Sequence, residues 1–342
     1  MSRAQWINNI RACDRVRHKG DAIMQSSQRA DMHIAVLAGG MSAEREISFS
    51  SGKNAVNALK QAGFGSVEML DPADDGFIDA MRTGSFDAAF IALHGTGGED
   101  GMIQHLMEYL GIPYTGSDAT SSVCGADKEL SKVLYERAGI PIAAGVTVHR
   151  GEQVDAEAVF EQLDGALFVK PAINGSSYGV TKVTKSDELA GAIARALEYS
   201  DKALVETCLE GTEITVGVFG DEDLQALPIV EICTPDTVDF YDLSVKYIVS
   251  DDIHRIPARL PEDVYARAQE LACRAHRALG CSGFSRSDFI VTADGPVILE
   301  TNTIPGMTDT SLFPDEVLHA GMEFSDVCAR LVEMAIERHE RR

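Results

Sequence analysis

One stretch of this sequence has the residue types and spacing for phosphate chemistry. Lys170 ends the apolar run 166–169, and the glycine-rich residues 175–179 lead into a second run, 180–183. Glycines in such a hairpin let backbone N–H groups approach a phosphate closely, and a lysine at a strand end supplies a point charge. The stretch predicts a phosphate cradle, with a plain glycine hairpin as the alternative. The two common nucleotide motifs, G-x-x-x-x-G-K-[ST] and a strand followed by G-x-G-x-x-G, are missing.

A second set of residues has the composition of a metal site. Arg286 and Asp288 open one predicted strand, and Glu300 and Asn302 end another. If these strands are adjacent, Asp288, Glu300 and Asn302 come together, and hard oxygen ligands of this kind suit Mg²⁺ completed by substrate phosphates. Solvated acids at strand ends are the alternative.

The segment after Asn302 has the character of a site wall. Residues 303–308 lack helix or strand periodicity, yet they are too apolar for a surface loop. Ser311 then precedes Pro314 and a helix with early acidic residues, so it lies close to a helix start. Free N–H groups there would bind a carboxylate or a phosphate, and simple capping by Ser311 is the alternative.

The helices and strands that must position these residues alternate in the first part of the chain. A chain of 342 residues is long enough for two or three domains. Short β-rich runs alternate with helical periods, which predicts a parallel sheet covered by helices. The expected strands are 33–38, 86–93 and 112–115, and the expected helices are 50–62 and 100–110. Residues 1–30 are mostly polar and are expected to lie outside the core.

Two further blocks have mixed patterns. The second, from about Ser117, fits a two-layer α+β unit with helices 127–138 and 187–199 and strands 166–172, 180–183 and 203–209. The third has strands 213–219, 224–232, 288–291 and 297–300, a helix over 261–279, and helices to the end. Its loop up to about Asp252 exceeds the usual connection length, so it is either disordered or a working lid.

Composition limits the partners. Acidic residues outnumber basic ones by 53 to 30, and the formal charge of −23 should repel nucleic acid and anionic membrane surfaces. No run approaches the roughly 18 apolar residues of a membrane-spanning helix, and the N-terminus has no secretory apolar core, so a cytoplasmic protein is expected. The seven cysteines are scattered and contain no C-x-x-C pair, which argues against a disulfide framework and a zinc site.

Taken in order, several short blocks resemble the D-alanine–D-alanine ligases of the ATP-grasp superfamily. The blocks are residues 37–40 with 42–48, 92–95 with 98–101, 113–117, 127–128, 169–171 with 175–177, Lys246 with Tyr247, Arg286 with Asp288, and 300–308. The resemblance runs from about His33 to the C-terminus. It implies a three-domain α/β ATP-grasp fold: an N-terminal extension 1–30, a parallel-sheet substrate domain 31–116, a central domain 117–209 and a C-terminal catalytic domain 210–342.

The same resemblance implies a reaction and its site residues. The reaction is ATP-driven joining of two D-alanines for peptidoglycan, by a homodimer. Nucleotide-binding residues by resemblance are Lys128, Lys170, Ser176, Ser177, Glu206, Cys208, Leu209, Glu213 and Phe240. Asp288, Glu300 and Asn302 match ligands of two Mg²⁺ ions, which Mn²⁺ could replace. Catalytic residues by resemblance are Glu44, Ser176, Tyr247, Arg286, Gly306 and Ser311, and substrate-binding residues are Glu44, His94, Lys246, Arg286, Ser311 and Leu312.

Individual roles also come from the resemblance. Glu44 matches the group that holds the ammonium of the first D-alanine, with His94 close by. Arg286 and the Gly306 N–H match an oxyanion site. Ser311 with Leu312 matches the site for the second carboxylate. Ser176 and Tyr247 match the link from Glu44 to the long loop.

Some positions depart from the family pattern, and rival functions remain. Thr207 and Cys208 replace the usual lysine–aromatic pair after Glu206, Tyr178 stands where a small aliphatic residue is common, and Asn174 where an acid is often seen. Rival functions are a ligase that makes D-alanyl-D-lactate or D-alanyl-D-serine, and a catalytically dead nucleotide-binding module. Lys246 with Tyr247 favours the dipeptide.

Overall fold

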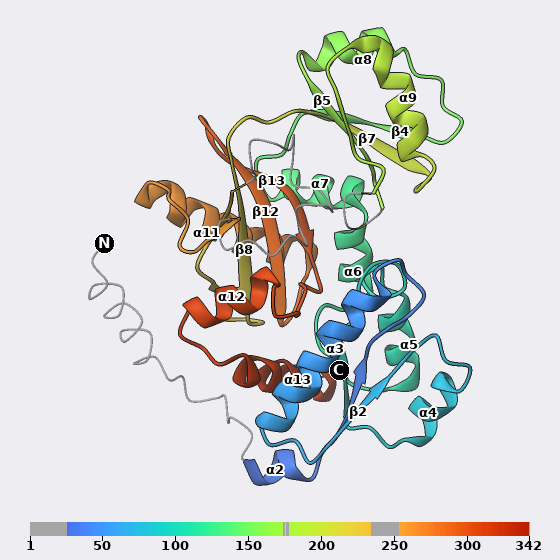
Figure 1. The fold of residues 1–342 in the computed structure, drawn as a ribbon, viewed down its shortest axis with the longest axis vertical. Helices are drawn as coiled ribbons and strands as arrows, with labels where there is room; N and C mark the ends of the chain where they lie inside the picture. Colours follow the sequence, from blue (N-terminus) through green and yellow to red (C-terminus); the bar gives the residue numbers. More distant parts are fainter. Residues whose placement is uncertain (1–25, 174, 176–177, 234–252, 342) are drawn as a thin grey trace.

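The computed structural model describes residues 26–173, 175, 178–233 and 253–341, and these residues form three β-sheets (Figure 1). The first sheet has the order β2 (Ser66–Leu70), β1 (His33–Leu37), β3 (Ala88–Ile91), and all of its pairs are parallel. Its helices are α3 (Arg45–Gln61), α4 (Phe77–Thr83) and α5 (Met102–Leu110). The prediction of a parallel sheet with helices is confirmed.

The predicted strand 112–115 is wrong. Residue Tyr114 makes only an isolated bridge to Ala89. The predicted elements also omitted β2 and α4, whose short segments are largely exposed and carry little periodic signal.

The second sheet lies at the top of Figure 1 and is antiparallel throughout. Its order is β4 (Gly145–His149), β7 (Lys202–Thr207), β5 (Leu167–Pro171), β6 (Thr181–Val183), with helices α8 (Ala156–Leu163) and α9 (Ser186–Ala196). These elements have an apolar core of their own. Helices α6 (Ala119–Ala126) and α7 (Lys128–Arg137) come before this sheet and connect it to the rest of the fold.

The third sheet is also antiparallel and has the order β11 (His254–Arg255), β10 (Val230–Ile232), β8 (Thr212–Phe219), β12 (Phe284–Thr292), β13 (Gly295–Asn302). Helix α11 (Glu262–Leu279) packs against it. The expected single strand 224–232 is two strands, because β9 (Gln225–Ala226) and β10 pair separately with β8. Pro228 lies between them and has no N–H for a ladder, which explains the break.

The last two helices bring the chain back to the first sheet. Apolar side chains of α12 (Leu312–His319) and α13 (Phe324–Glu340) share one core with β1, β3 and α3, and Figure 1 shows α13 beside α3. We therefore keep the division into 31–116, 117–209 and 210–342 as a proposal, in which α13 also belongs to the first unit. Among the described residues, no helix combines the length and apolar character needed to cross a membrane.

The described fold begins before His33. Helix α2 (Ser26–Ala30) lies against the end of the first unit, where the Gly65 N–H donates to the Arg29 carbonyl over 3.1 Å. The Arg29 guanidinium binds Glu333 of α13 through Nη2 at 2.6 Å and Nε at 3.0 Å, and the Glu333 side chain is only 2% exposed. Helix α2 is therefore mostly exposed, but Arg29 attaches it to the first unit and to α13, so its contacts are those of the fold rather than of an outlying extension.

We expect Arg29→Ala to lower the free energy of unfolding by about 3 kcal/mol, because it leaves the buried Glu333 carboxylate without its main partner. The effect should be at the low end of such losses, since Arg330 remains 3.6 Å from Glu333 Oε2. The matched control is Arg341→Ala, which removes an exposed pair with Glu222 and should change stability little. Urea unfolding of the three proteins measures this, and equal losses in both variants would contradict it.

Candidate active site

One face of the third sheet gathers the predicted metal ligands and the predicted oxyanion arginine. The β12–β13 register places Asp288 opposite Glu300 and Arg286 opposite Asn302. The β8–β12 register places Thr215 opposite Asp288 and Gly217 opposite Arg286. Directly opposed residues point to the same face of a sheet. The structure therefore brings together Arg286, Asp288, Glu300 and Asn302, as predicted from adjacent strands.

Each carboxylate on this face has a cationic partner. Arg286 donates to Asp288 through Nε at 3.2 Å and Nη2 at 3.1 Å, and Thr215 Oγ1 donates to Asp288 at 2.5 Å. Lys128, the first residue of α7, lies 3.1 Å from Glu300 Oε2. Burial alone would lower the pKa of Arg286, but the adjacent Asp288 carboxylate outweighs burial and raises it. Arg286 is therefore a permanent cation.

These residues fit a magnesium ion by their chemistry. Asp288 and Glu300 supply carboxylate oxygens and Asn302 an amide oxygen, the donors that Mg²⁺ prefers. The Asn302 Oδ1 atom also accepts the Ile304 N–H over 3.0 Å, which fixes the orientation of the amide. Within the described part of the chain, no set of three or more His, Cys, Asp or Glu side chains has the arrangement of a metal site. Further ligands would have to come from substrate.

A second charged cluster lies on the sheet of β5 and β7. Glu206 is 3% exposed and forms ion pairs with two lysines, Lys170 at 2.6 Å and Lys132. Burial would raise the pKa of Glu206, but the two ammonium groups lower it. Burial lowers the pKa of Lys132, whereas Glu206 raises that of Lys170 against burial. The cluster carries more positive than negative charge, which suits an anion.

Lys132 was not among the predicted site residues. It lies one helical turn after Lys128 on α7, so both lysines occur on the same side of the helix. The spacing of four residues was therefore a usable signal. Lys202 fixes the start of the same helix, since its Nζ lies 2.5 Å from Asp127 and 2.6 Å from Glu129.

The predicted nucleotide residues Cys208, Leu209 and Glu213 follow β7 and lead into β8. The Cys208 N–H donates to the Ala166 carbonyl over 2.8 Å, which extends the sheet toward this connection. By strand alternation, Glu213 lies on the same face of β8 as Thr215 and Gly217. The connection thus joins the Glu206 cluster to the sheet face that carries Asp288.

Glu44 is placed where the first unit approaches the glycine-rich stretch. It precedes α3, and its Oε2 lies 2.6 Å from the position that a Cβ on Gly95 would take and 3.2 Å from that on Gly175. Glycine at both positions leaves room for the carboxylate, and a Cβ at residue 95 would require the Glu44 side chain to shift. Ser176 and Ser177 lie outside the described residues, as do Phe240, Lys246 and Tyr247.

His94 has both ring nitrogens engaged by neighbouring residues. Nδ1 lies 3.3 Å from Glu99 Oε1, and Nε2 lies 2.9 Å from Ser51 Oγ, which also accepts the Met307 N–H over 3.3 Å. With a proton on Nδ1 shared with Glu99, the Ser51 hydroxyl donates to Nε2. His94 therefore holds the 303–308 loop through Ser51, a residue that the sequence did not single out because its partners are distant in the chain.

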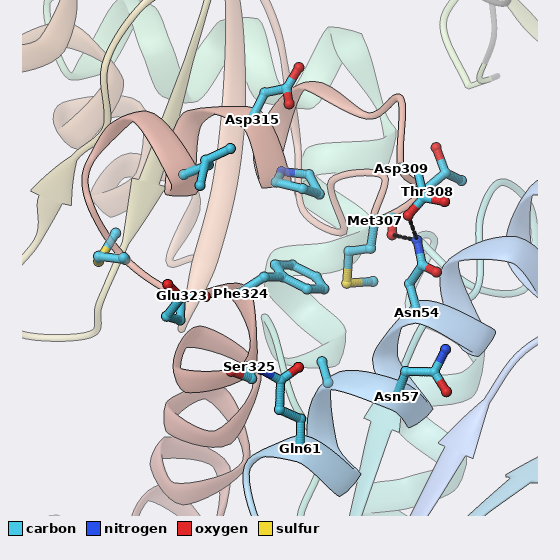
Figure 2. A pocket seen from close by; sticks show the side chains of 14 residues that line it. Asn54, Asn57, Gln61, Met307, Thr308, Asp309, Asp315, Glu323, Phe324 and Ser325 are labelled. Atoms are coloured by element: carbon cyan, nitrogen blue, oxygen red, sulfur yellow. Dashed lines mark hydrogen bonds between the residues drawn. The ribbon is translucent and has the colours of Figure 1, made fainter.

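A cavity of about 360 Å³ lies behind this loop, between α3, α12 and the start of α13 (Figure 2). Asn54 donates across it from α3 to the Met307 carbonyl over 3.1 Å and to Asp309 over 2.9 Å. Met307 and Thr308 of the predicted site wall line this cavity, but none of the predicted catalytic, substrate-binding, nucleotide-binding or metal residues does. The sheet face, rather than the cavity, is therefore the candidate active site.

Ser311 does not cap α12 with its side chain, so the simple capping alternative is wrong. Its hydroxyl accepts the Thr308 N–H over 3.0 Å, and it lies 2.8 Å from the position of a Cβ on Gly306. A Cβ at residue 306 would therefore require the Ser311 side chain to shift. The first N–H groups of α12, beginning with Leu312, receive no bond from the Ser311 side chain.

Glu316 is a further group that the sequence did not single out. It lies one turn further along α12, its side chain is fully buried, and Oε1 accepts the Gly217 N–H over 2.7 Å. Burial raises its pKa to about 8, although the Gly217 N–H and the Arg286 charge act in the opposite direction. The carboxyl is therefore mostly protonated at neutral pH.

Comparison with known proteins gives one family. A family model described as the D-ala D-ala ligase C-terminus matches residues 134–333, and one described as the N-terminus matches residues 70–117. The D-alanine–D-alanine ligase of Syntrophobacter fumaroxidans is 45% identical over 304 residues, covering 89% of this chain and 97% of that protein. That of Pelotomaculum thermopropionicum is 41% identical over 313 residues, covering 90% and 97%. The crystal structure of the Bacillus anthracis enzyme complexed with ATP has a TM-score of 0.77 at 28% identity, covering 91% of this chain and 99% of that chain.

The burial of Glu316 predicts a pH-dependent stability. In the unfolded chain the carboxyl loses its proton near pH 4.5, whereas the native carboxyl keeps it up to about pH 8. Between these values the native state binds more protons, so the free energy of unfolding falls as pH rises and levels off above about pH 8. The Glu316→Gln variant has no ionisable group at this position. The free energy of unfolding of the variant minus that of the wild type should therefore increase by a few kcal/mol from pH 5 to pH 8.5. Chemical unfolding at both pH values tests this; a constant difference would contradict it.

Proposed function

The chain belongs to the D-alanine–D-alanine ligase family, and from the sheet face described above we propose how its residues perform the ATP-dependent ligation of two D-alanines for peptidoglycan synthesis. The observation that carries the assignment of roles is the Arg286–Asp288–Glu300 array with Lys128 beside it. It combines two carboxylates, a half-buried permanent cation and a lysine ammonium group. Phosphoryl transfer to a carboxylate, and the later attack of the amine on the acyl phosphate, both need such groups.

The first step activates a carboxylate. A carboxylate is a poor electrophile, so that of the first D-alanine receives the γ-phosphoryl group of ATP, which gives D-alanyl phosphate and ADP. Lys128 and Lys170 contact the phosphates, and Glu206, Cys208, Leu209 and Glu213 line the nucleotide. Asp288, Glu300 and Asn302 would hold Mg²⁺, which neutralises charge on the transferring group when it is bound. We propose that two such ions bind.

Glu44 orients the first substrate. Its carboxylate lies between Gly95 and Gly175, where the first unit and the glycine-rich stretch meet. The ammonium group of the first D-alanine would pair with this carboxylate. His94 supports this region indirectly, since both of its nitrogens are already bonded to Ser51 and Glu99.

The second step forms the peptide bond. The free amine of the second D-alanine attacks the acyl carbon, the bond from that carbon to the phosphate oxygen breaks, and the departing phosphate takes up the excess proton of the amine. Arg286 and the Gly306 N–H stabilise the negative charge that develops on the acyl oxygen. The second carboxylate binds at the start of α12, near Ser311 and Leu312, where N–H groups and the helix dipole favour an anion.

We also propose that the protein is a homodimer in the cytoplasm and that it prefers D-alanine over D-lactate or D-serine as the second substrate. The preference comes from the resemblance at Lys246 and Tyr247, which lie outside the described residues.

Purified full-length protein with ATP, Mg²⁺ and D-alanine should release phosphate and form D-alanyl-D-alanine in equal amounts. Replacing half of the D-alanine by D-serine or D-lactate should leave the dipeptide as the main product. Mass spectrometry of products measures both. Phosphate release that does not depend on D-alanine would contradict the function, and a main product containing D-lactate would contradict the proposed preference.

Glu300→Gln should reduce ligation at least about 100-fold in a folded protein, because one charge is lost where phosphoryl charge develops. The matched control is Asp294→Asn, which removes an exposed carboxylate from the turn of the same hairpin and should keep wild-type activity. Coupled ADP-release assays compare the variants. Activity of Glu300→Gln within about tenfold of wild type would contradict its role.

A further inference from the structure

Glu316 replaces a missing partner in the third sheet. The Gly217 carbonyl of β8 accepts the Leu227 N–H over 2.8 Å, but the break between β9 and β10 leaves the Gly217 N–H without an acceptor from that side. Glu316 Oε1, from α12, accepts it instead over 2.7 Å. A side chain of a helix thus completes the hydrogen bonding of a strand.

Gly217 and Glu316 also fit one another sterically. A Cβ on Gly217 would lie 2.5 Å from Glu316 Oε2, closer than unbonded atoms can approach. The φ angle of Gly217 is not among the positive values in this chain, so space rather than backbone conformation requires glycine here. The buried carboxyl, together with Leu227 Cδ1 at 2.9 Å, occupies the volume that a side chain at residue 217 would take.

The same register places Glu316 next to the oxyanion arginine. Arg286 lies directly opposite Gly217, and such pairs have Cβ positions about 4.5–5.5 Å apart. The Glu316 carboxyl therefore lies beside the stem of Arg286. The charged groups that shift the pKa of Glu316 are Arg286 and Asp288 from β12 and Asp315 from α12. Glu316 in turn raises the pKa of Tyr265 from α11.

The proposed second-substrate site lies at the N-terminal end of α12. Ser311 and Leu312 precede Glu316 by little more than one turn, about 6–8 Å along the helix axis. A shift of the helix on the sheet would move these residues relative to Arg286. We propose that Glu316 is a positioning residue that fixes the second-substrate site of α12 relative to Arg286, an inference that rests on the proposed function.

An apolar residue could fill this volume without the cost of burying a carboxyl group, so packing alone does not account for Glu316. A mostly protonated carboxyl keeps the acceptor for Gly217 without a full buried charge. Glutamine has the same acceptor and nearly the same shape. The hydrogen bond from the Gly217 N–H, rather than a negative charge on Glu316, should therefore hold α12 in position.

The first test compares Glu316→Gln with Glu316→Leu in the full-length protein. We expect Glu316→Gln to stay within about threefold of wild type in kcat and in all KM values. Glu316→Leu should raise KM for the second D-alanine about 3- to 10-fold, the loss expected for one net hydrogen bond, with KM for ATP unchanged. Leu318→Ala, an exposed position on α12, is the control and should match wild type.

A double-mutant cycle covers the case in which Glu316→Leu does not fold. Gly217→Ala should raise KM for the second D-alanine because its Cβ meets Glu316 Oε2 at 2.5 Å and Leu227 Cδ1 at 2.9 Å. In the Glu316→Ala background only the Leu227 contact is left, so the rise caused by Gly217→Ala should be smaller than in the wild-type background. Additive effects would overturn the proposal, as would a Glu316→Gln variant that behaves like Glu316→Leu or an equal rise in KM for ATP. A wild-type protein that makes no dipeptide would instead overturn the proposed function.

Discussion

The arrangement of this active site depends on one constraint: carboxylates in a partly dehydrated space must have cationic partners. Removing a charge from water is costly, and the cost is recovered only when an opposite charge lies in good geometry. Asp288 has Arg286, Glu300 has Lys128, and Glu206 has Lys170 with Lys132. Two kinds of pair result. The Arg286 pair lies within one strand and is fixed, whereas the lysine pairs use flexible side chains that can exchange a carboxylate for a phosphate oxygen.

Helix α7 connects these pairs across two sheets. Lys128 reaches Glu300 on the third sheet, and Lys132, one turn later, reaches Glu206 on the second. The helix start is fixed by Lys202 of β7 and by the Lys128 N–H, which donates to the Ala172 carbonyl over 2.9 Å. Because one helix carries both lysines, the spacing between the proposed metal ligands and the Glu206 cluster is set by backbone geometry rather than by side-chain conformations.

The parts of the site that the sequence could predict are those that depend on local order. Asp288 and Glu300 follow from two strands joined by a tight turn, since such strands pair with each other. The Glu316–Gly217 bond joins residues 99 positions apart, and the Ser51–Met307 bond spans 256. No local pattern indicates such contacts. Glu316 in particular has the sequence character of an exposed helix residue, and only the break at Pro228 gives it a backbone N–H to bind.

The cores of the three units differ in how they are connected. Apolar side chains of α12 and α13, such as Phe313 and Val317, share a core with the first sheet, and Glu316 ties α12 to the third. The second sheet has a separate core, and across its boundary Lys128, on the helix that precedes that sheet, pairs with Glu300. Separation of the first and third units would expose apolar surface, and so would removal of α7 and the residues just after it, since Tyr135 and Ile140 lie in the core of the third sheet. The second sheet itself has a core apart from both. In the proposed function, phosphates compete for Lys128 and Lys170 at this boundary, away from the contact of α12 with Gly217 and Arg286, so we expect nucleotide binding to act on the position of the second sheet before it acts on the Arg286–α12 geometry.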